Sequence, residues 1–194
     1  MYPPAWALAH STRLDLDEFS AAFANAWSRT VSRFLKLESW QAYREVAANE
    51  SQVRYDRGDI EGARDLLRRE AEADRPLYLD VQRRKIEYAR VRIVGEPLTP
   101  YLEYEMLSYR IRSEMGEHIE IVAEPIAKLP DERYFDFLLF DGHTALVHDY
   151  GSGDVGRQTG GWLTHDRDAL VAMEETITEL RRRAVPLIRF LATV

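Results

Sequence analysis

The chain of 194 residues contains no cysteine. Disulfide bonds and metal sites built from thiolates are therefore excluded. A chain without cysteine suits a reducing compartment, so we expect a cytoplasmic protein. Long apolar stretches are missing too. The run near Phe137–Phe140 is far shorter than the ~20 residues of a membrane-spanning helix, and the N-terminus lacks the pattern of a signal peptide. We expect no membrane association.

The chain has fewer basic than acidic residues. Lys and Arg number 26 against 33 Asp and Glu, which gives a formal net charge of −7. Proteins that bind nucleic acids present a concentrated positive surface to the phosphates, so we expect no direct nucleic-acid binding. The best local basic stretch lies within residues 83–92. Its simplest interpretation is a charged helix end that runs into a strand with its arginines pointing outward, and contact with an anion is the alternative.

The first half of the chain is predicted to be mainly helical. Apolar residues recur at helical spacing over residues 16–28. A second helix is expected over residues 39–53 because Ser39 is a good N-cap, a third over residues 59–74, and a short one after Pro76. The segment between the first two helices fits either a strand or a continued helix.

The second half is predicted to combine strands with two long helices. Residues 87–94 end in Arg-Val-Arg-Ile-Val, whose alternation and β-branching indicate a strand. Thr99 and Pro100 suit the start of a helix that runs to about Glu114. Residues 119–123 alternate as a second strand.

Asp141-Gly142 is the strongest hairpin signal in the chain, because a tight primed turn needs positive φ at its centre. A glycine-rich loop over residues 151–161 follows. Asp166 is then expected to cap a last long helix, whose C-terminal arginines suit the helix dipole. Its buried stripe is predicted to include Leu170, Met173, Ile177 and Leu180.

Together these elements predict an α+β or α/β fold. A helical N-terminal portion, residues 1–88, is expected to pack on a small mixed sheet covered by helices, residues 89–194. No linker rich in Pro, Gly and Ser divides the chain, so one continuous domain is the alternative to this division.

The glycine-rich loop fits G-x-G-x-x-G over residues 151–156. That fingerprint binds dinucleotides only between a strand and a helix whose N-terminus holds the pyrophosphate. Here no helix is expected before Asp166 and only 38 residues follow Gly156. We therefore predict a flexible loop, and contact with a partner or ligand stays open.

The histidines give no metal site. His143 and His148 lie an odd number of positions apart on one predicted strand, so they should face opposite sides of it. No H-E-x-x-H or comparable spacing is present. We expect neither a metal nor a cofactor and assign no catalytic residue.

The predicted helix from Thr99 carries the most informative polar residue. Its tyrosines suit a core, whereas a buried Glu105 would need a cationic partner, and Arg92 on the preceding strand is the candidate. Such a pair is either structural or the floor of a pocket. The candidate binding residues are Arg92, Tyr101, Glu105, Glu117 and, in the glycine-rich loop, Arg157.

Several pieces of sequence, in a fixed order, resemble a known family over residues 34–186. They are Arg90-Val91-Arg92-Ile93-Val94, Pro97-Leu98-Thr99-x-Tyr101, Tyr104-Glu105, Gly116-Glu117-x-Ile119 and Asp136-Phe137-x-Leu139-Phe140-Asp141. These pieces resemble the actinobacterial domain-of-unknown-function family 6879. The resemblance implies a gene neighbourhood rich in helix-turn-helix regulators and their small partner proteins, and so a regulatory role.

Residues 137–186 also resemble the degenerate phospholipase-D-like domain of some transcription regulators. Active members use H-x-K with an Asp after four further residues, and counting back from Asp141 places Tyr134 and Asp136 at the His and Lys positions. Neither residue can replace its counterpart, because the chemistry needs a nucleophilic imidazole and a cation for the phosphate. The resemblance therefore implies that the phosphodiesterase site is absent.

Three hypotheses follow. The first is a non-enzymatic regulatory protein that binds another protein, a helix-turn-helix regulator, with a homodimer left open. The second is a nuclease or other phosphate-handling enzyme around Arg92, Tyr101, Glu105 and Glu117. The third is a ligand sensor whose pocket lies under the glycine-rich loop. An enzyme needs polar groups that converge in one cleft and titrate abnormally, whereas a protein-binding surface needs an exposed apolar patch.

Overall fold

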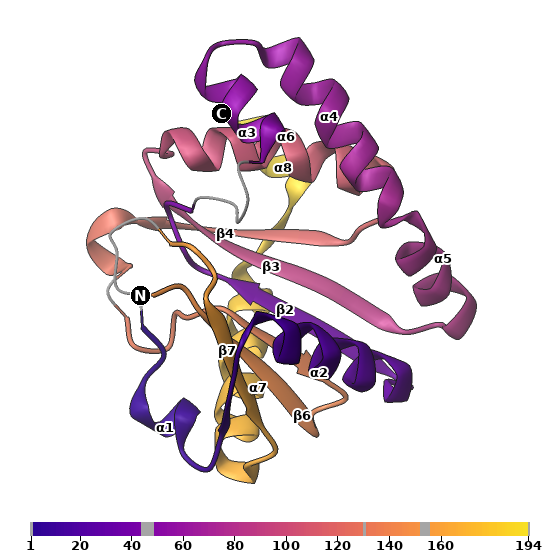
Figure 1. The fold of residues 1–194 in the computed structure, drawn as a ribbon. Helices are drawn as coiled ribbons and strands as arrows, with labels where there is room; N and C mark the ends of the chain where they lie inside the picture. The colour runs from indigo at the N-terminus through magenta and orange to yellow at the C-terminus, as the bar shows by residue number, and fades with distance from the viewer. Residues whose placement is uncertain (1, 44–48, 130, 152–155, 194) are drawn as a thin grey trace.

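A computed structural model describes residues 2–43, 49–129, 131–151 and 156–193 (Figure 1). Its centre is a mixed sheet whose strands follow the order β1-β7-β6-β5-β2-β3-β4-β8. Strand β3 pairs in parallel with β2 and with β4, and the other pairs are antiparallel. The predicted mixed sheet with helices is confirmed. The strands are β1 Thr12–Leu14, β2 Arg33–Glu38, β3 Glu87–Glu96, β4 Ile119–Pro125, β5 Phe137–Phe140, β6 Thr144–Asp149, β7 Gly160–Thr164 and β8 Val185–Pro186.

Helices cover both faces of this sheet (Figure 1). One face packs on α7, and the other packs on α2 at one end and on α6 at the other. Helix α4 packs outside α6 and α3 packs on α4, while α5 leads from α4 to the start of β3 (Figure 1). The helices are α1 Ala5–Leu8, α2 Leu16–Arg29, α3 Glu50–Asp56, α4 Ile60–Ala73, α5 Arg75–Arg84, α6 Pro100–Glu114, α7 Arg167–Arg183 and α8 Leu187–Phe190, with the 3₁₀ turn η1 Ile126–Lys128.

The last long helix forms as its sequence predicts. The Asp166 side chain accepts a hydrogen bond from the Ala169 N–H and so caps α7. Its predicted apolar stripe is buried against the odd-numbered residues of β2, β3 and β5. The buried members are Leu170, Met173, Ile177 and Leu180.

The predicted hairpin is also confirmed, between β5 and β6. Asp141 and Gly142 have φ of 50° and 71°, as the centre of a tight primed turn requires. The Asp141 carboxylate accepts hydrogen bonds from the backbone N–H groups of residues 31–33 and from the Ser32 hydroxyl. This turn therefore also fixes the chain between α2 and β2.

Helix α6 begins and ends where the sequence places it. Thr99 caps it by accepting a hydrogen bond from the Leu102 N–H. Beyond its end, Gly116 has φ of 108°, which a glycine adopts without steric cost. Because one side of α6 is buried between the sheet and α4, its polar residues Glu105 and Ser108 lie inside the protein.

Two expectations about the elements are wrong. No helix starts at Ser39: that residue is buried, and its N–H and hydroxyl both donate to Asp136. The helix α3 begins only at Glu50, capped by Asn49, and residues 44–48 lie outside the described part. The glycine-rich segment is not wholly a loop either, because Gly160 starts strand β7; residues 152–155 lie outside the described part.

The first 88 residues contribute two strands as well as helices. Strand β2 lies at the middle of the sheet, between β3 and β5. The division at residue 88 and the alternative of one continuous domain both stay predictions.

Candidate functional site

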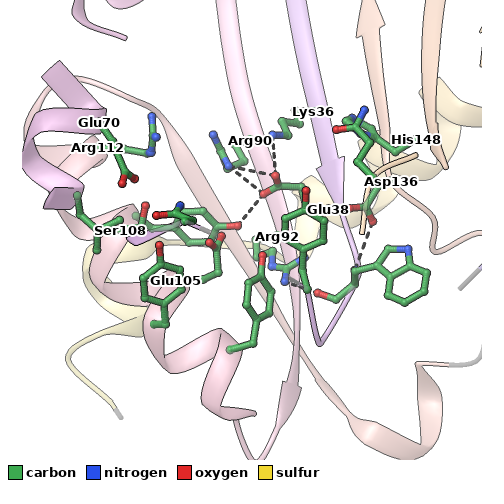
Figure 2. Close-up of a pocket in the computed structure, with 18 of the residues that line it drawn as sticks. Lys36, Glu38, Glu70, Arg90, Arg92, Glu105, Ser108, Arg112, Asp136 and His148 are labelled. Carbon is green, nitrogen blue, oxygen red and sulfur yellow. Dashed lines mark hydrogen bonds and ion pairs between the residues drawn. The ribbon is translucent and has the colours of Figure 1, made fainter. Parts of the chain in front are cut away.

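A cavity of about 320 Å³ opens on the face of the sheet that carries α2 and α6. At the start of β2 and β3, this face is covered by α2, which packs on Phe34 and Tyr88. Further along β3, Val94 packs on α6. The strand residues between these two contacts are charged rather than apolar, and they form the floor of the cavity (Figure 2).

The Glu38 carboxylate, on β2, contacts three other side chains on the cavity floor. It lies 2.6 Å from the Lys36 ammonium and 3.1 Å from the Arg90 guanidinium, and it accepts a 2.7 Å hydrogen bond from the Tyr109 hydroxyl. Burial would raise the pKa of Glu38, but the neighbouring cations, Arg90 first, hold it well below its usual value. Glu38 is therefore an ionised and fully engaged carboxylate.

The network continues from Arg90 to Glu117, a buried residue that does not line the cavity. The Arg90 Nε lies 2.7 Å from the Glu117 carboxylate, which also accepts hydrogen bonds from the hydroxyls of Tyr78 and Tyr88 at 2.8 and 2.7 Å. Burial opposes ionisation of Glu117, yet Arg90 and the two hydroxyls together lower its pKa. Glu117 thus positions Arg90 and does not itself line the cavity.

Arg92, two residues further along β3, is buried and forms no ion pair with a carboxylate of the described residues. Its side chain lines the cavity, and the residue is 2% exposed. It donates one hydrogen bond among the described residues, to the Trp40 carbonyl, and its Nε has no partner. The guanidinium carbon lies 5.9 Å from the centre of the Tyr101 ring. Burial disfavours its charge, whereas Glu38 and Asp136 attract that charge at longer range and help to raise its pKa. Buried charges in proteins are normally paired directly, so a guanidinium with no ion pair among the described residues is an unusual feature.

The expected ion pair between Arg92 and Glu105 is wrong, since no described carboxylate lies within 4.0 Å of the Arg92 guanidinium. Both residues nevertheless line the same cavity. Burial and then repulsion by Glu38 raise the pKa of Glu105, against the attraction of Arg92. The two groups face a shared space instead of each other.

Glu105 belongs to a polar stripe on α6. Residues at every third or fourth position of a helix share one face, and on α6 such a set lines the cavity: Tyr101, Glu105, Ser108 and Arg112. Figure 2 shows Glu105, Ser108 and Arg112 on the α6 side, with Lys36, Arg90 and Arg92 on the strands. At the outer end, Arg112 pairs with Asp74 next to α4.

Asp136 and His148 close the other end. One Asp136 oxygen accepts hydrogen bonds from the Ser39 N–H and hydroxyl and from the Trp40 N–H, and the other accepts from the Tyr150 hydroxyl at 2.8 Å. The His148 ring stacks on Tyr150 at 5.6 Å, and its nitrogens have no partner among the described residues. Burial lowers the pKa of His148 to about 3, so its imidazole is neutral.

Three of the five predicted site residues line this cavity: Arg92, Tyr101 and Glu105. Glu117 lies behind it, and Arg157 has an exposed side chain and is not among the lining residues. The arginines of β3 were expected to point outward, and Arg90 and Arg92 instead point inward.

Sequence reasoning missed Lys36, Glu38, Asp136 and His148. The signal for the first two was present in the sequence, because Lys36 and Glu38 alternate with Leu35 and Leu37 in the segment that becomes β2. Such alternation indicates a strand with one polar face.

The arrangement is suited to binding a small molecule. Cavities of this size hold ligands in many proteins, and this one combines charged groups on a rigid sheet with aromatic walls. In the described part of the chain, no cluster of three or more acidic or histidine side chains is placed to hold a metal ion. Nor does any described helix have the length and apolar character to cross a bilayer.

No curated protein matches the sequence, and no solved structure matches the fold. Residues 21–192 match a family described as "Domain of unknown function (DUF6879)". This range contains every residue of the cavity described above. The chain therefore belongs to the DUF6879 family.

Proposed function

We propose that this protein is a ligand-sensing domain that binds a small molecule with an acid group in the cavity between α6 and the strands β2 and β3. The observation that carries the proposal is the buried Arg92 guanidinium, which lines the cavity without a carboxylate partner among the described residues. A carboxylate or phosphate of the ligand would supply the missing counter-charge.

Arg92 is costly to bury, because its guanidinium forms no ion pair with a described carboxylate. Removing a guanidinium from water without pairing it costs several kcal/mol, on the order of the penalty for a buried ion. Its fork of N–H donors matches a carboxylate or phosphate. The other cations of the cavity already have carboxylate partners: Lys36 and Arg90 pair with Glu38, and Arg112 pairs with Asp74. Arg92 is therefore the group left for a ligand.

Two further observations support binding at this site. Tyr150, which directly precedes the glycine-rich segment, and Gln158, which lies within it, line the cavity, and this supports the ligand-sensor hypothesis. The polar groups also converge in one cleft, which was the feature expected of an enzyme and not of an exposed apolar protein-binding patch. A ligand site needs the same convergence of a few polar groups. Binding to a helix-turn-helix regulator, and an actinobacterial regulatory role, stay predictions from the family resemblance.

The test is ligand-induced stabilisation of the purified protein. We would measure thermal unfolding with a panel of small carboxylates, inorganic phosphate and the L-amino acids, and repeat it with Arg92→Met. A ligand at about 100 times its Kd stabilises the folded state by about 2.7 kcal/mol, a shift of several degrees. Arg110→Met is the matched control, because Arg110 is exposed on the outer face of α6 and pairs only with exposed Glu114.

We expect at least one member of the panel to raise the melting temperature of the wild type and of Arg110→Met, with no ligand effect on Arg92→Met. The proposal is wrong if no member stabilises the wild type, or if the ligand-induced shift survives in Arg92→Met.

A further inference from the structure

We infer that the ligand is a zwitterion of the amino-acid type, with its acid group on Arg92 and its ammonium group on Glu105. This inference rests on the proposed function and adds the chemical class of the ligand. It starts from the balance of charge in the cavity and from the partners that its carboxylates already have.

The cavity holds more acidic than basic groups. The described lining residues include four cations, Lys36, Arg90, Arg92 and Arg112, and five carboxylic acids, Glu38, Glu70, Asp74, Glu105 and Asp136. Glu117 adds a further carboxylate behind Arg90. A polyanion such as a nucleotide phosphate would add negative charge to this excess. A molecule with one acid and one amine leaves the balance unchanged and still supplies a partner for Arg92.

Three of the five lining acids are already engaged. Glu38 pairs with Lys36 and Arg90, and Asp74 pairs with Arg112. Asp136 accepts four hydrogen bonds from backbone, serine and tyrosine groups. These carboxylates stabilise the walls and leave little capacity for a ligand.

Glu105 is the acid best placed for an ammonium group. It makes no ion pair with a described residue, it is 9% exposed, and it lies on the stripe of α6 that faces the strands. Figure 2 shows Glu105 and Arg92 on opposite elements around one space. Glu70 also lacks an ion pair among the described residues, but it lies at the outer end on α4, away from Arg92 (Figure 2).

The electrostatic state of Glu105 agrees with this role. Its pKa is raised by burial and by Glu38. An ammonium group beside it would favour the ionised form again, because a nearby positive charge lowers the pKa of a carboxyl. The charged and titratable groups around it are Glu38, Arg90 and Arg92 on the strands and Tyr109 on α6.

The rest of the cavity favours an aromatic side chain on the ligand. Five tyrosines and a tryptophan line it, and Leu67 is the single aliphatic member of the described lining. Aromatic rings pack on one another edge to face or offset, as Trp40 and Tyr150 already do at 5.1 Å and 67°. The best probes are therefore the aromatic amino acids.

The experiment compares molecules that differ in one charged group. Isothermal titration would measure L-phenylalanine, L-tyrosine and L-tryptophan, together with 3-phenylpropionate, which lacks the amine, and phenethylamine, which lacks the acid. Charge-assisted hydrogen bonds contribute about 1.5–3 kcal/mol, or about 10-fold to 150-fold in affinity. We expect at least one amino acid to bind about tenfold or more tightly than the acid or the amine.

Two variants test whether Glu105 contacts the ammonium group of the ligand. Glu105→Gln should weaken the amino acid about tenfold or more and change 3-phenylpropionate by less than about threefold, since only the ammonium contact is lost. Glu103→Gln is the matched control, because Glu103 is an exposed glutamate of the same helix, and it should change neither.

The possible failures are distinct. If 3-phenylpropionate binds as tightly as every amino acid and Glu105→Gln changes nothing, the zwitterion inference is wrong while the acid-binding site survives. If the amino acids bind but Glu105→Gln binds them equally well, Glu105 is not the ammonium contact and the inference is also wrong. If neither these probes nor the wider panel of carboxylates and phosphate binds, both the inference and the proposed function fail.

Discussion

Replacing Glu117 by Ala should destabilise the protein by about 4 kcal/mol. The carboxylate is buried and holds Arg90 at 2.7 Å and the hydroxyls of Tyr78 and Tyr88 at 2.8 and 2.7 Å. Each hydroxyl left without a partner costs about 1–3 kcal/mol. Breaking a buried ion pair costs about 3–5 kcal/mol. Because Arg90 still pairs with Glu38 in this variant, the loss of its ion pair with Glu117 should cost less than that.

The assay is urea unfolding at neutral pH, with free energies extrapolated to water. Glu114→Ala is the matched control, because Glu114 is an exposed glutamate whose ion pair with Arg110 is a surface one and contributes below about 1 kcal/mol. A loss for Glu117→Ala within about 1 kcal/mol of the control would refute the view that Glu117 anchors the cavity floor.

The same variant has a pH signature. The folded-state pKa of Glu117 is lowered, so its contribution is fully present above the unfolded carboxyl pKa of about 4.3. That contribution is lost as the pH falls through the lower folded-state value. The wild type should therefore lose more stability than Glu117→Ala between neutral pH and about pH 3. Equal losses in the two proteins would show that Glu117 is not held ionised by the fold.

Three other changes test the remaining structure. Arg92→Met should stabilise the protein without added ligand by about 1–2 kcal/mol, because it removes a buried charge that forms no ion pair with a described residue, and urea unfolding would show a loss if Arg92 were structural. Glu105→Ala should change stability by less than about 1 kcal/mol, since no ion pair is broken. Asp141→Ala should cost about 2–3 kcal/mol, because the carboxylate accepts four hydrogen bonds. Nucleotide and lipid phosphodiesters should not be turned over by metal-free protein, and turnover that disappears in Tyr134→Ala would contradict this.

Local signals predicted most of the helices and the hairpin. Caps such as Thr99 and Asp166 and the turn at Asp141-Gly142 act within a few residues of their own position, so one sequence suffices to find them. Ser39 shows where this reasoning fails. It looks like a helix cap, yet its hydroxyl and N–H donate to Asp136, 97 residues away, and no local pattern contains that partner.

The candidate site was predictable only in part, for the same reason. Arg92 and Glu105 stood out because both are charged residues in segments that read as buried. Lys36 and Glu38 became part of the site only because β2 lies beside β3 in the sheet, and that neighbour cannot be read from spacing. The distance between Arg92 and Glu105 depends on how far α6 stands from the strands, which is set by the groups packed between them.

The site and the core beneath α7 occupy opposite sides of the same strands. On β3, Arg90 and Arg92 face the cavity while Val91 and Ile93 face α7. Inserting one residue before Arg90 would exchange the two sets and would direct two guanidinium groups into the apolar layer. Substitutions in this strand can therefore alter the cavity floor one position at a time, whereas a change in its length would remove the cavity floor and the core together.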